Sequence, residues 1–188
     1  MEVLGFIGII ILACIIFGAM WFVMGYNSLV HLRALLKEAW SGIDVQLKRR
    51  YDLIPNLVET VKGYSIHEKS TLENIAKYRS ASMNATTVEA KAGAEAGLAQ
   101  ALKTLFAVAE NYPQLKANEN FMRLQKDLSK IEDELQLARR YYNGTARNYN
   151  IKVQMFPSRI IAGITGFTVE PYFELSNAAE REVPTVKF

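Results

Sequence analysis

The apolar positions near the start of the chain form one unbroken run, from Val3 to Met24, that contains no charged residue. As an α-helix the run is ~33 Å long, which matches the ~30 Å hydrocarbon core of a bilayer. A cleaved signal peptide is the alternative, but no Lys or Arg precedes the run, the run is long for such a peptide, and no small-x-small cleavage site follows it. The pattern therefore predicts one retained transmembrane helix within residues 1–26.

Residues at the end of the run fit a membrane interface. Trp21 and Tyr26 stand where an aromatic belt is expected, and Arg33 and Lys37 are the first cations that follow the run. The positive-inside rule then places the N-terminus outside and the large C-terminal part in the cytoplasm. We therefore expect a single-pass protein of the cell (inner) membrane, with the lipid bilayer as its first partner.

Beyond residue 26 the apolar spacing is helical along most of the chain. A first series runs from Leu29 to Val61, and no Pro lies between Met24 and Leu53, so we expect the membrane helix to continue into this series without a linker. An alanine-rich segment at residues 88–111 forms a second amphipathic pattern. The sequences NATTVEAK and ENYPQLKANEN mark the main turns.

The longest pattern is a seam from Phe121 to Phe156, in which apolar positions, Ala138 among them, alternate three and four residues apart. Asn118 precedes this coiled-coil-like helix and Pro157 ends it. Together the patterns predict an all-α fold, in which a single N-terminal transmembrane helix continues into an elongated antiparallel bundle of three to four long helices. The expected domains are an anchor at residues 1–26, the bundle at residues 27–156 and an apolar C-terminal segment with a tail at residues 157–188.

The stretch LKRRYDLIPNLVETVKGYSIHE in the first helical series combines several features of a site. Pro55 cannot donate to the carbonyl of Tyr51, so we expect a helix that passes through it to kink or restart. Lys48, Arg49 and Arg50 have two interpretations. They form either a solvated face paired with neighbouring acids or a contact surface for another subunit or protein.

Catalytic and metal-binding chemistry lack the residues that they need. His67 and Glu68 open the zinc motif H-E-x-x-H, but Thr71 occupies the place of the second histidine, and the other histidine, His31, lies beside the apolar run. The single cysteine, Cys14, excludes an intramolecular disulfide and a Cys-rich metal site. There is no glycine-rich phosphate loop, and no base accompanies a Ser or Cys nucleophile. We expect no enzyme activity, no cofactor and no metal.

The C-terminal segment MFPSRIIAGITGFTVEPYFEL is too apolar for a solvated tail. Ile160, Ile161, Ile164 and Phe167 share one helical face over two turns. This face either folds back over the end of its own bundle or packs against a neighbouring subunit. If the chain runs out, back and out again, the segment lies at the end of the bundle away from the membrane.

Three blocks of this sequence carry a resemblance to a known family. They are YNSLVHLRALLKEAWSGIDVQLKRRYDLIPNLVETVKGYSIHEKSTLE, ENYPQLKANENFMRLQKDLSKIEDELQLARRYYNGTARNYN and FPSRIIAGITGFTVEPYFE. From about Tyr26 to Glu174 the chain resembles the LemA family of bacterial membrane proteins. The resemblance implies a short external N-terminus, one membrane helix and a helical-bundle domain in the cytoplasm, and it implies no enzyme activity.

The remaining function classes are structural. The net charge of +3 is nearly balanced, so composition indicates neither nucleic acid nor an acidic substrate as partner. We also expect no small-molecule substrate. One hypothesis is a membrane-anchored bundle that self-associates as a homo-oligomer or scaffolds other membrane or cytoplasmic proteins. The alternative is a helical sensor or adaptor that passes a signal from the membrane to a cytoplasmic partner, with Pro55 and Gly63 as its bend. The mass of the assembly in mild detergent distinguishes the two.

Overall fold

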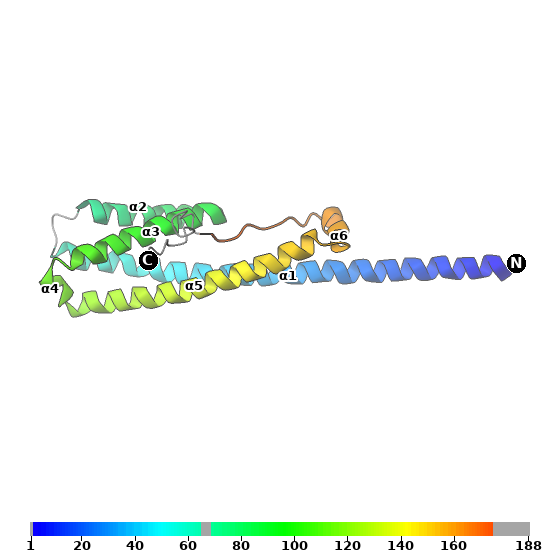
Figure 1. Ribbon diagram of the computed structural model, residues 1–188, viewed down its shortest axis with the longest axis horizontal. Coiled ribbons are helices and arrows are strands. Elements are labelled where there is room, and N and C mark those ends of the chain that lie inside the picture. Colours follow the sequence, from blue (N-terminus) through cyan, green and yellow to red (C-terminus); the bar gives the residue numbers. More distant parts are fainter. Residues whose placement is uncertain (1, 65–68, 175–188) are drawn as a thin grey trace, which may run out of the picture. The chain divides into compact units, whose positions relative to one another are not determined.

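The computed structural model describes residues 2–64 and 69–174, with side chains from Phe6 onward. Within these residues all regular structure is helical and no strand occurs, so the all-α prediction is confirmed (Figure 1). The helices are α1 (Glu2–Lys62), α2 (Lys69–Asn84), α3 (Val88–Ala109), α4 (Pro113–Lys116), α5 (Glu119–Gln154) and α6 (Ser158–Thr165).

Helix α1 joins the apolar run to the polar part of the chain without a break. It has 61 residues, and the mean hydropathy of its most apolar 18-residue window is 2.8. None of that window is buried against the rest of the chain, so this is not the core helix of a soluble fold. Helix α1 is therefore long and apolar enough to cross a membrane, and its expected continuation past the apolar run is confirmed.

The helix is not interrupted at Pro55, so the expected restart there is wrong. Helix α1 continues from Pro55 to Lys62. The carbonyl of Tyr51, which Pro55 leaves without its usual backbone donor, instead accepts a hydrogen bond of 2.9 Å from Nε of Arg79 in α2. A side chain of the neighbouring helix thus replaces the missing donor. The expected bend at Pro55 stays a prediction.

The chain divides into two compact units. The first unit comprises Met1–Trp40 with Tyr142–Glu170, and the second comprises Ser41–Tyr141 with Pro171–Phe188. Helices α1 and α5 each contribute to both units.

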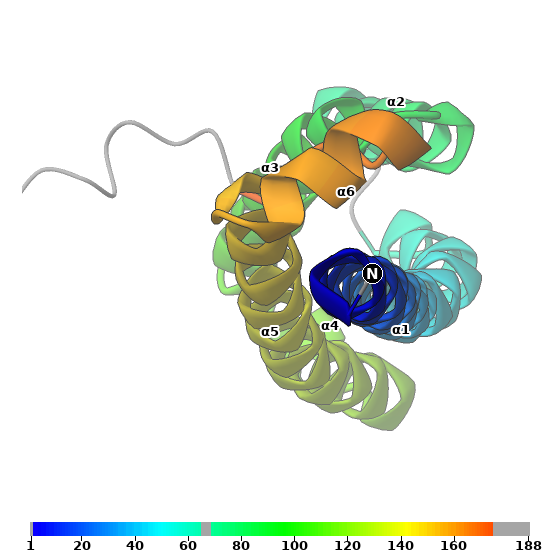
Figure 2. The ribbon, with the colours of Figure 1, turned by 90° about the vertical axis from the view of Figure 1, so that its right-hand side faces the viewer.

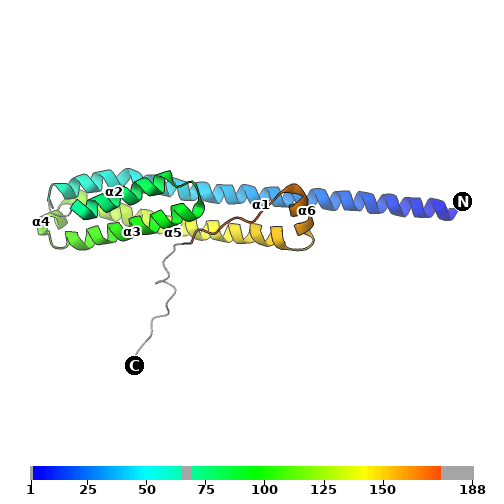
Figure 3. The same cartoon turned by 90° about the horizontal axis from the view of Figure 1, so that it is seen from above.

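In the second unit, the later part of α1 packs with α2, α3 and the earlier part of α5 (Figure 3). Helix α3 runs in the same direction as α1, because the residue numbers of its contacts rise together with those of α1. Helix α5 runs in the opposite direction, because the residue numbers of its contacts fall as those of α1 rise. The contacts that show this are Asp44–Lys91 and Arg50–Glu95 for α3, and Arg49–Glu134 and Tyr64–Asn118 for α5. The buried apolar side chains include Ile43, Leu47, Ile54, Leu57, Ile75, Leu98, Leu102, Leu105, Phe121, Leu128, Ile131 and Leu135.

Side-chain caps begin the two helices whose starts the sequence marks. The hydroxyl of Thr87 accepts a hydrogen bond from the backbone N–H of Ala90 at the start of α3. The side chain of Asn118 accepts one of 3.0 Å from the N–H of Phe121 at the start of α5. These helices confirm the alanine-rich pattern and the long seam as separate elements.

One reversal of the chain is missing from the sequence prediction. Helix α1 ends at Lys62 and a separate helix, α2, begins at Lys69, whereas the expected turns lay only near residues 86 and 115. Because this adds one reversal, α5 returns toward the apolar part of α1, and the segment after it lies beside Gly25. The expectation that the C-terminal segment lies away from the membrane end is therefore wrong.

The first unit contains the earlier part of α1, the end of α5 and helix α6. The rings of Trp40 in α1 and Tyr142 in α5 meet edge to face, with their centroids 5.3 Å apart. The side chain of Asn150 in α5 both donates to and accepts from the backbone of Glu170, each bond being 2.8 Å. This pair of bonds fixes the segment that follows α6 against α5.

Gly97 allows close packing of α3 on α2. A Cβ atom at this position would overlap the ring of Tyr78. We expect Gly97→Ala to destabilise the chain, because overpacking of about 1–3 kcal/mol outweighs the gain of about 1 kcal/mol in helix propensity. Gly93, one turn earlier, is the matched control, since a Cβ there meets no atom within 4 Å. Denaturant midpoints should fall for Gly97→Ala and rise for Gly93→Ala; equal rises would show that the Tyr78 ring moves away freely.

Candidate functional site: a buried charge network

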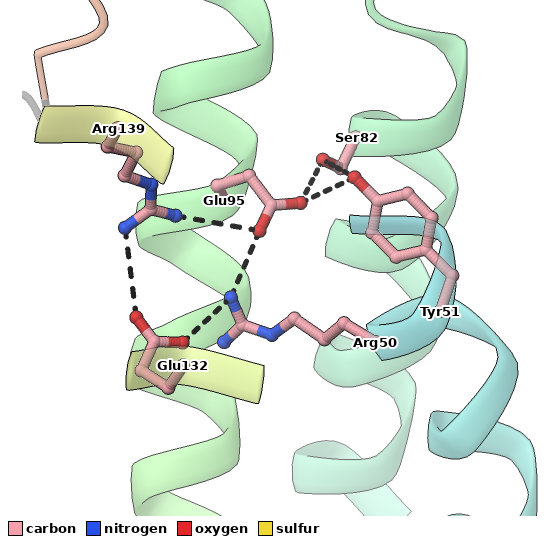
Figure 4. Close-up of polar contacts among 6 residues, drawn as sticks. All are labelled: Arg50, Tyr51, Ser82, Glu95, Glu132 and Arg139. Atoms are coloured by element: carbon pink, nitrogen blue, oxygen red, sulfur yellow. Dashed lines mark hydrogen bonds and ion pairs between the residues drawn. The ribbon is translucent and has the colours of Figure 1, made fainter. Parts of the chain in front are cut away.

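Four helices of the second unit each place polar side chains at one buried point (Figure 4). Helix α1 supplies Arg50 and Tyr51, α2 supplies Ser82, and α3 supplies Glu95. Two residues of α5 that lie two turns apart complete the group, which we call the charge network: Arg50, Tyr51, Ser82, Glu95, Glu132 and Arg139.

Glu95 is the centre of the charge network. Its Oε2 accepts from Nη1 of Arg50 at 3.0 Å and lies 3.9 Å from Nη2 of Arg139. Its Oε1 accepts from the hydroxyl of Tyr51 at 2.6 Å and also from the hydroxyl of Ser82. The carboxylate thus contacts two cations on one side and two hydroxyls on the other, so each of its oxygens is engaged.

Glu132 closes the charge network at its outer side. It lies 3.1 Å from Nη1 of Arg50 and 3.7 Å from Nη1 of Arg139. Two carboxylates therefore face two guanidinium groups, and the formal charges cancel. This balance is what allows Arg50 and Glu95 to be buried, because an unpaired ion in the interior is strongly unfavourable.

The burial of this group affects its acid–base properties. Burial is the main cause that raises the pKa of Tyr51 far above its usual value, and the negative charge of Glu95 adds to this effect. Burial likewise lowers the pKa of Arg139, whereas Glu132 and Glu95 act in the opposite direction. The Tyr51 hydroxyl therefore keeps its proton and acts as a donor to Glu95 at neutral pH.

Arg139 is held by an aromatic contact as well as by ions. Its guanidinium lies 5.1 Å from the ring centroid of Phe173, at a distance typical of a cation–π contact. Within the described residues its Nε makes no hydrogen bond. Phe173 itself is buried, so residues 171–174 lie against the network.

The chemistry of the charge network is structural. Its carboxylates are neutralised by arginines, and its hydroxyls donate to a carboxylate that is already saturated, so no activated nucleophile results. No group of three potential metal ligands occurs in the part of the chain with described side chains. Four helices, α1, α2, α3 and α5, thus meet here in one hydrogen-bonding pattern.

A groove of about 420 Å³ opens beside the network, between α3 and α5. Arg50 and Glu132 belong to both, so the groove connects the buried charges with the surface. Its walls are mainly apolar, and its lining residues are Ala99, Leu102, Lys103, Phe106, Gln125, Leu128 and Ser129, together with Arg50 and Glu132.

The basic triplet does not form one surface. Lys48 is exposed and pairs with Asp52 at 3.5 Å, and Arg49 pairs with Glu134 of α5. Arg50 is only 3% exposed, so it is not available as a surface contact. The helical repeat explains the difference, because Arg50 occupies the core-facing side of α1 and its two neighbours do not. His67 and Glu68 lie outside the described residues.

The residues predicted for the membrane interface lie in the first unit together with the C-terminal apolar face. Tyr26 meets the ring of Phe167 edge to face at 5.9 Å, and the guanidinium of Arg33 lies 5.7 Å from the same ring centroid. Trp21 is half-buried and Lys37 is exposed. Of the predicted face, Ile161 is buried, Phe167 is half-buried, and Ile160 and Ile164 are exposed. Contacts within the chain therefore use only part of this face.

Comparison with known proteins identifies a family. The family model described as the LemA family matches residues 39–188. The chain belongs to the LemA family. It is 26% identical over 188 residues to magnetosome protein MamQ 2 of Paramagnetospirillum magneticum, with 86% of this chain and 69% of the relative covered. It is 30% identical over 141 residues to protein LemA of Metamycoplasma hominis, with 72% of this chain and 63% of the relative covered.

The match to the LemA family includes every residue of the charge network, since Arg50 and Arg139 lie within residues 39–188. Sequence reasoning missed the network apart from Arg50, because it searched for catalytic and metal-binding patterns. A usable signal is present: Glu95 stands one turn before Leu98 and two turns before Leu102 on the apolar face of α3, where an apolar residue would be expected.

Proposed function

We propose that this LemA-family chain is a non-enzymatic, single-pass membrane protein whose cytoplasmic, elongated antiparallel bundle self-associates or scaffolds partners at the membrane. The observation that carries the proposal is α1, which joins an exposed apolar segment of bilayer length to a helical unit in one unbroken helix. The cations that follow the span, Arg33 and Lys37, support the cytoplasmic placement. The relatives named MamQ and LemA carry no enzyme name, which is consistent with a structural role.

The second unit carries an exposed face suited to self-association. Val45 of α1 and Leu137 and Tyr141 of α5 are each more than half exposed. They lie one or two turns from the ion pair between Arg49 and Glu134, on the same sides of their helices as that pair. We call this surface the α1–α5 face. Apolar residues beside a charged pair are the composition of many protein interfaces, in which a polar rim surrounds an apolar centre.

A charge placed at the centre of this face should weaken the assembly. We expect the full chain in mild detergent to be a homo-oligomer by native mass, and Leu137→Glu to lower its mass, because the introduced carboxylate would be buried without a partner. Met83→Glu on α2 is the matched control, since Met83 is exposed to a similar degree and lies outside the α1–α5 face. It should leave the mass unchanged. Helical circular dichroism should be the same for both variants.

The outcomes separate the parts of the proposal. A wild-type chain that is monomeric at all concentrations would contradict self-association. An oligomer that Leu137→Glu leaves intact would place the interface elsewhere. The sensor or adaptor function remains the second candidate, and the continuity of α1 from the span to Arg50 and Tyr51 favours it. A monomer or dimer that recovers a stoichiometric cytoplasmic partner would support that alternative.

A further inference from the structure

Helix α6 lies beside α1 at the end of the apolar run. The side chain of Ile161 contacts Gly25 so closely that a Cβ atom at position 25 would overlap its Cδ1. One residue further along α1, Tyr26 meets Phe167, which follows α6. The contact therefore falls immediately after Met24, where the apolar run ends. If the bilayer surface meets α1 where the apolar run ends, α6 lies at the level of that surface.

Helix α6 also lies across α1 rather than along it. Figure 2 looks along the N-terminal part of α1, which is seen nearly end-on, whereas α6 is seen along its length. If α1 crosses the bilayer, α6 is close to the membrane plane. This is the orientation of interfacial amphipathic helices.

Large apolar side chains on α6 and just before it remain exposed. Ile160 and Ile164, one turn apart in α6, are 50% and 70% exposed, and Phe156, in the turn before α6, is 78% exposed. Ile160 and Ile164 lie on the same helical face as Ile161, which is buried, as is Ala162. We call the three exposed residues, Phe156, Ile160 and Ile164, the stripe. Large apolar side chains gathered in this way indicate an interaction surface rather than ordinary surface residues.

The charges around this stripe fit anionic lipid. Helix α6 contains Arg159, which is exposed, and it contains no Asp or Glu. Lys152 stands in the last turn of α5, and Arg33 lies over the ring of Phe167. Cations that flank an apolar stripe are the pattern by which interfacial helices combine insertion of apolar side chains with attraction to phosphate headgroups.

We propose that the stripe Phe156, Ile160 and Ile164 inserts into the headgroup region of the membrane that α1 crosses, as a second and interfacial membrane contact. The bilayer is favoured over a second copy of the chain because the contact between Ile161 and Gly25 holds α6 against the end of the span. The contact orients α1 and the end of α5 relative to the membrane, because Asn150 fixes the segment after α6 to α5. This inference rests on the membrane anchor of the proposed function.

The test uses single-cysteine variants of the full chain in a Cys14→Ser background, each labelled with an environment-sensitive fluorophore and reconstituted into vesicles of phosphatidylethanolamine and phosphatidylglycerol. Ile164→Cys reports on α6, Ile10→Cys reports on the span, and Ser80→Cys on the exposed side of α2 is the aqueous control. Lipids that carry a nitroxide near the headgroup or at mid-chain then quench labels at the corresponding depth.

We expect the label at position 164 to be blue-shifted and to lose fluorescence with the headgroup nitroxide, the label at position 10 to lose it with the mid-chain nitroxide, and the label at position 80 to keep it. Adding Phe156→Asp should reduce quenching at position 164, whereas Met83→Asp should not. If position 10 is quenched and position 164 behaves like position 80, the interfacial contact is refuted and the anchor stands. Absence of quenching at position 10 would overturn the anchor itself.

A neighbouring subunit gives a different result. In that case the label at position 164 is blue-shifted but no nitroxide lipid quenches it, and its emission returns to that of position 80 when empty vesicles dilute the protein. This outcome would refute lipid as the occupant and assign the stripe to an interface between copies of the chain.

Discussion

Glu95→Ala is expected to lower the free energy of unfolding by about 3–5 kcal/mol, which is the usual effect of removing one partner from a buried ionic group. Without this carboxylate, Arg50 and Arg139 share Glu132 alone, and one positive charge stays buried without a partner. The hydroxyls of Tyr51 and Ser82 lose the acceptor that each now contacts. The measurement is guanidinium unfolding of the full chain in mild detergent, followed by circular dichroism.

Three further variants show which interaction dominates. Glu59→Ala removes an exposed glutamate of α1 and should change the stability by less than about 0.5 kcal/mol. Glu95→Gln keeps an acceptor for Tyr51 but removes the charge, so a loss close to that of Glu95→Ala would make electrostatics the main cause. Arg50→Met combined with Glu95→Leu removes one charge of each sign and leaves Arg139 paired with Glu132, so it should recover most of the stability.

A small effect would contradict the structural role. If Glu95→Ala costs no more than Glu59→Ala, the interior around Arg50 must be open to water, since only solvation could then replace the lost carboxylate. If the double variant is as unstable as Glu95→Ala, the arginine itself contributes packing that a methionine does not reproduce.

The sequence predicted the elements that have strong local signals. The long seam became α5, because Asn118 caps its first turn and Pro157 follows its end. The alanine-rich pattern became α3, because Thr87 caps its first turn. The apolar run and its continuation became α1, because no helix-breaking residue lies between Met24 and Leu53. These features depend on neighbouring residues and can be read without knowledge of the fold.

Two features of the fold depend on contacts that are distant in sequence. The end of α1 follows Lys62, where Gly63 is the single local signal, and the stronger helix breaker, Pro55, lies inside the helix. Pro55 is tolerated because Arg79 of another helix supplies a donor to the carbonyl of Tyr51. Local rules therefore placed the break at the proline and missed the reversal that brings α6 to Gly25.

The charge network was hidden by the same dependence on tertiary structure. The seam placed Ala138 at a core position, but the structure buries Arg139 and leaves Ala138 partly exposed. A charged residue is assigned to the surface by pattern alone, since its burial requires a partner from elsewhere in the chain. The recognisable sign is that Arg50, Glu95 and Arg139, of both signs, each fall on the apolar side of a different helix.

Ile10→Arg combined with Leu12→Arg is expected to abolish stable insertion of the chain in the membrane. Each arginine near the centre of a transmembrane helix costs about 2.5–3.5 kcal/mol, so the pair costs about 5–7 kcal/mol, more than ~1,000-fold in the insertion equilibrium. Both native side chains are exposed, so the substitution should leave the second unit folded. The measurement is the fraction of full-length protein that stays in the membrane pellet after extraction with alkaline carbonate.

The matched control adds the same two charges outside the span. Ser80→Arg with Gln100→Arg places them on exposed positions of α2 and α3, and this variant should stay in the pellet like the wild type. If the Ile10 and Leu12 variant also stays in the pellet, the apolar run of α1 is not the main anchor. The two membrane contacts can then be told apart. Adding Phe156→Asp to that variant should release it only if the α6 stripe holds the chain at the surface, because insertion of interfacial helices depends on their apolar face.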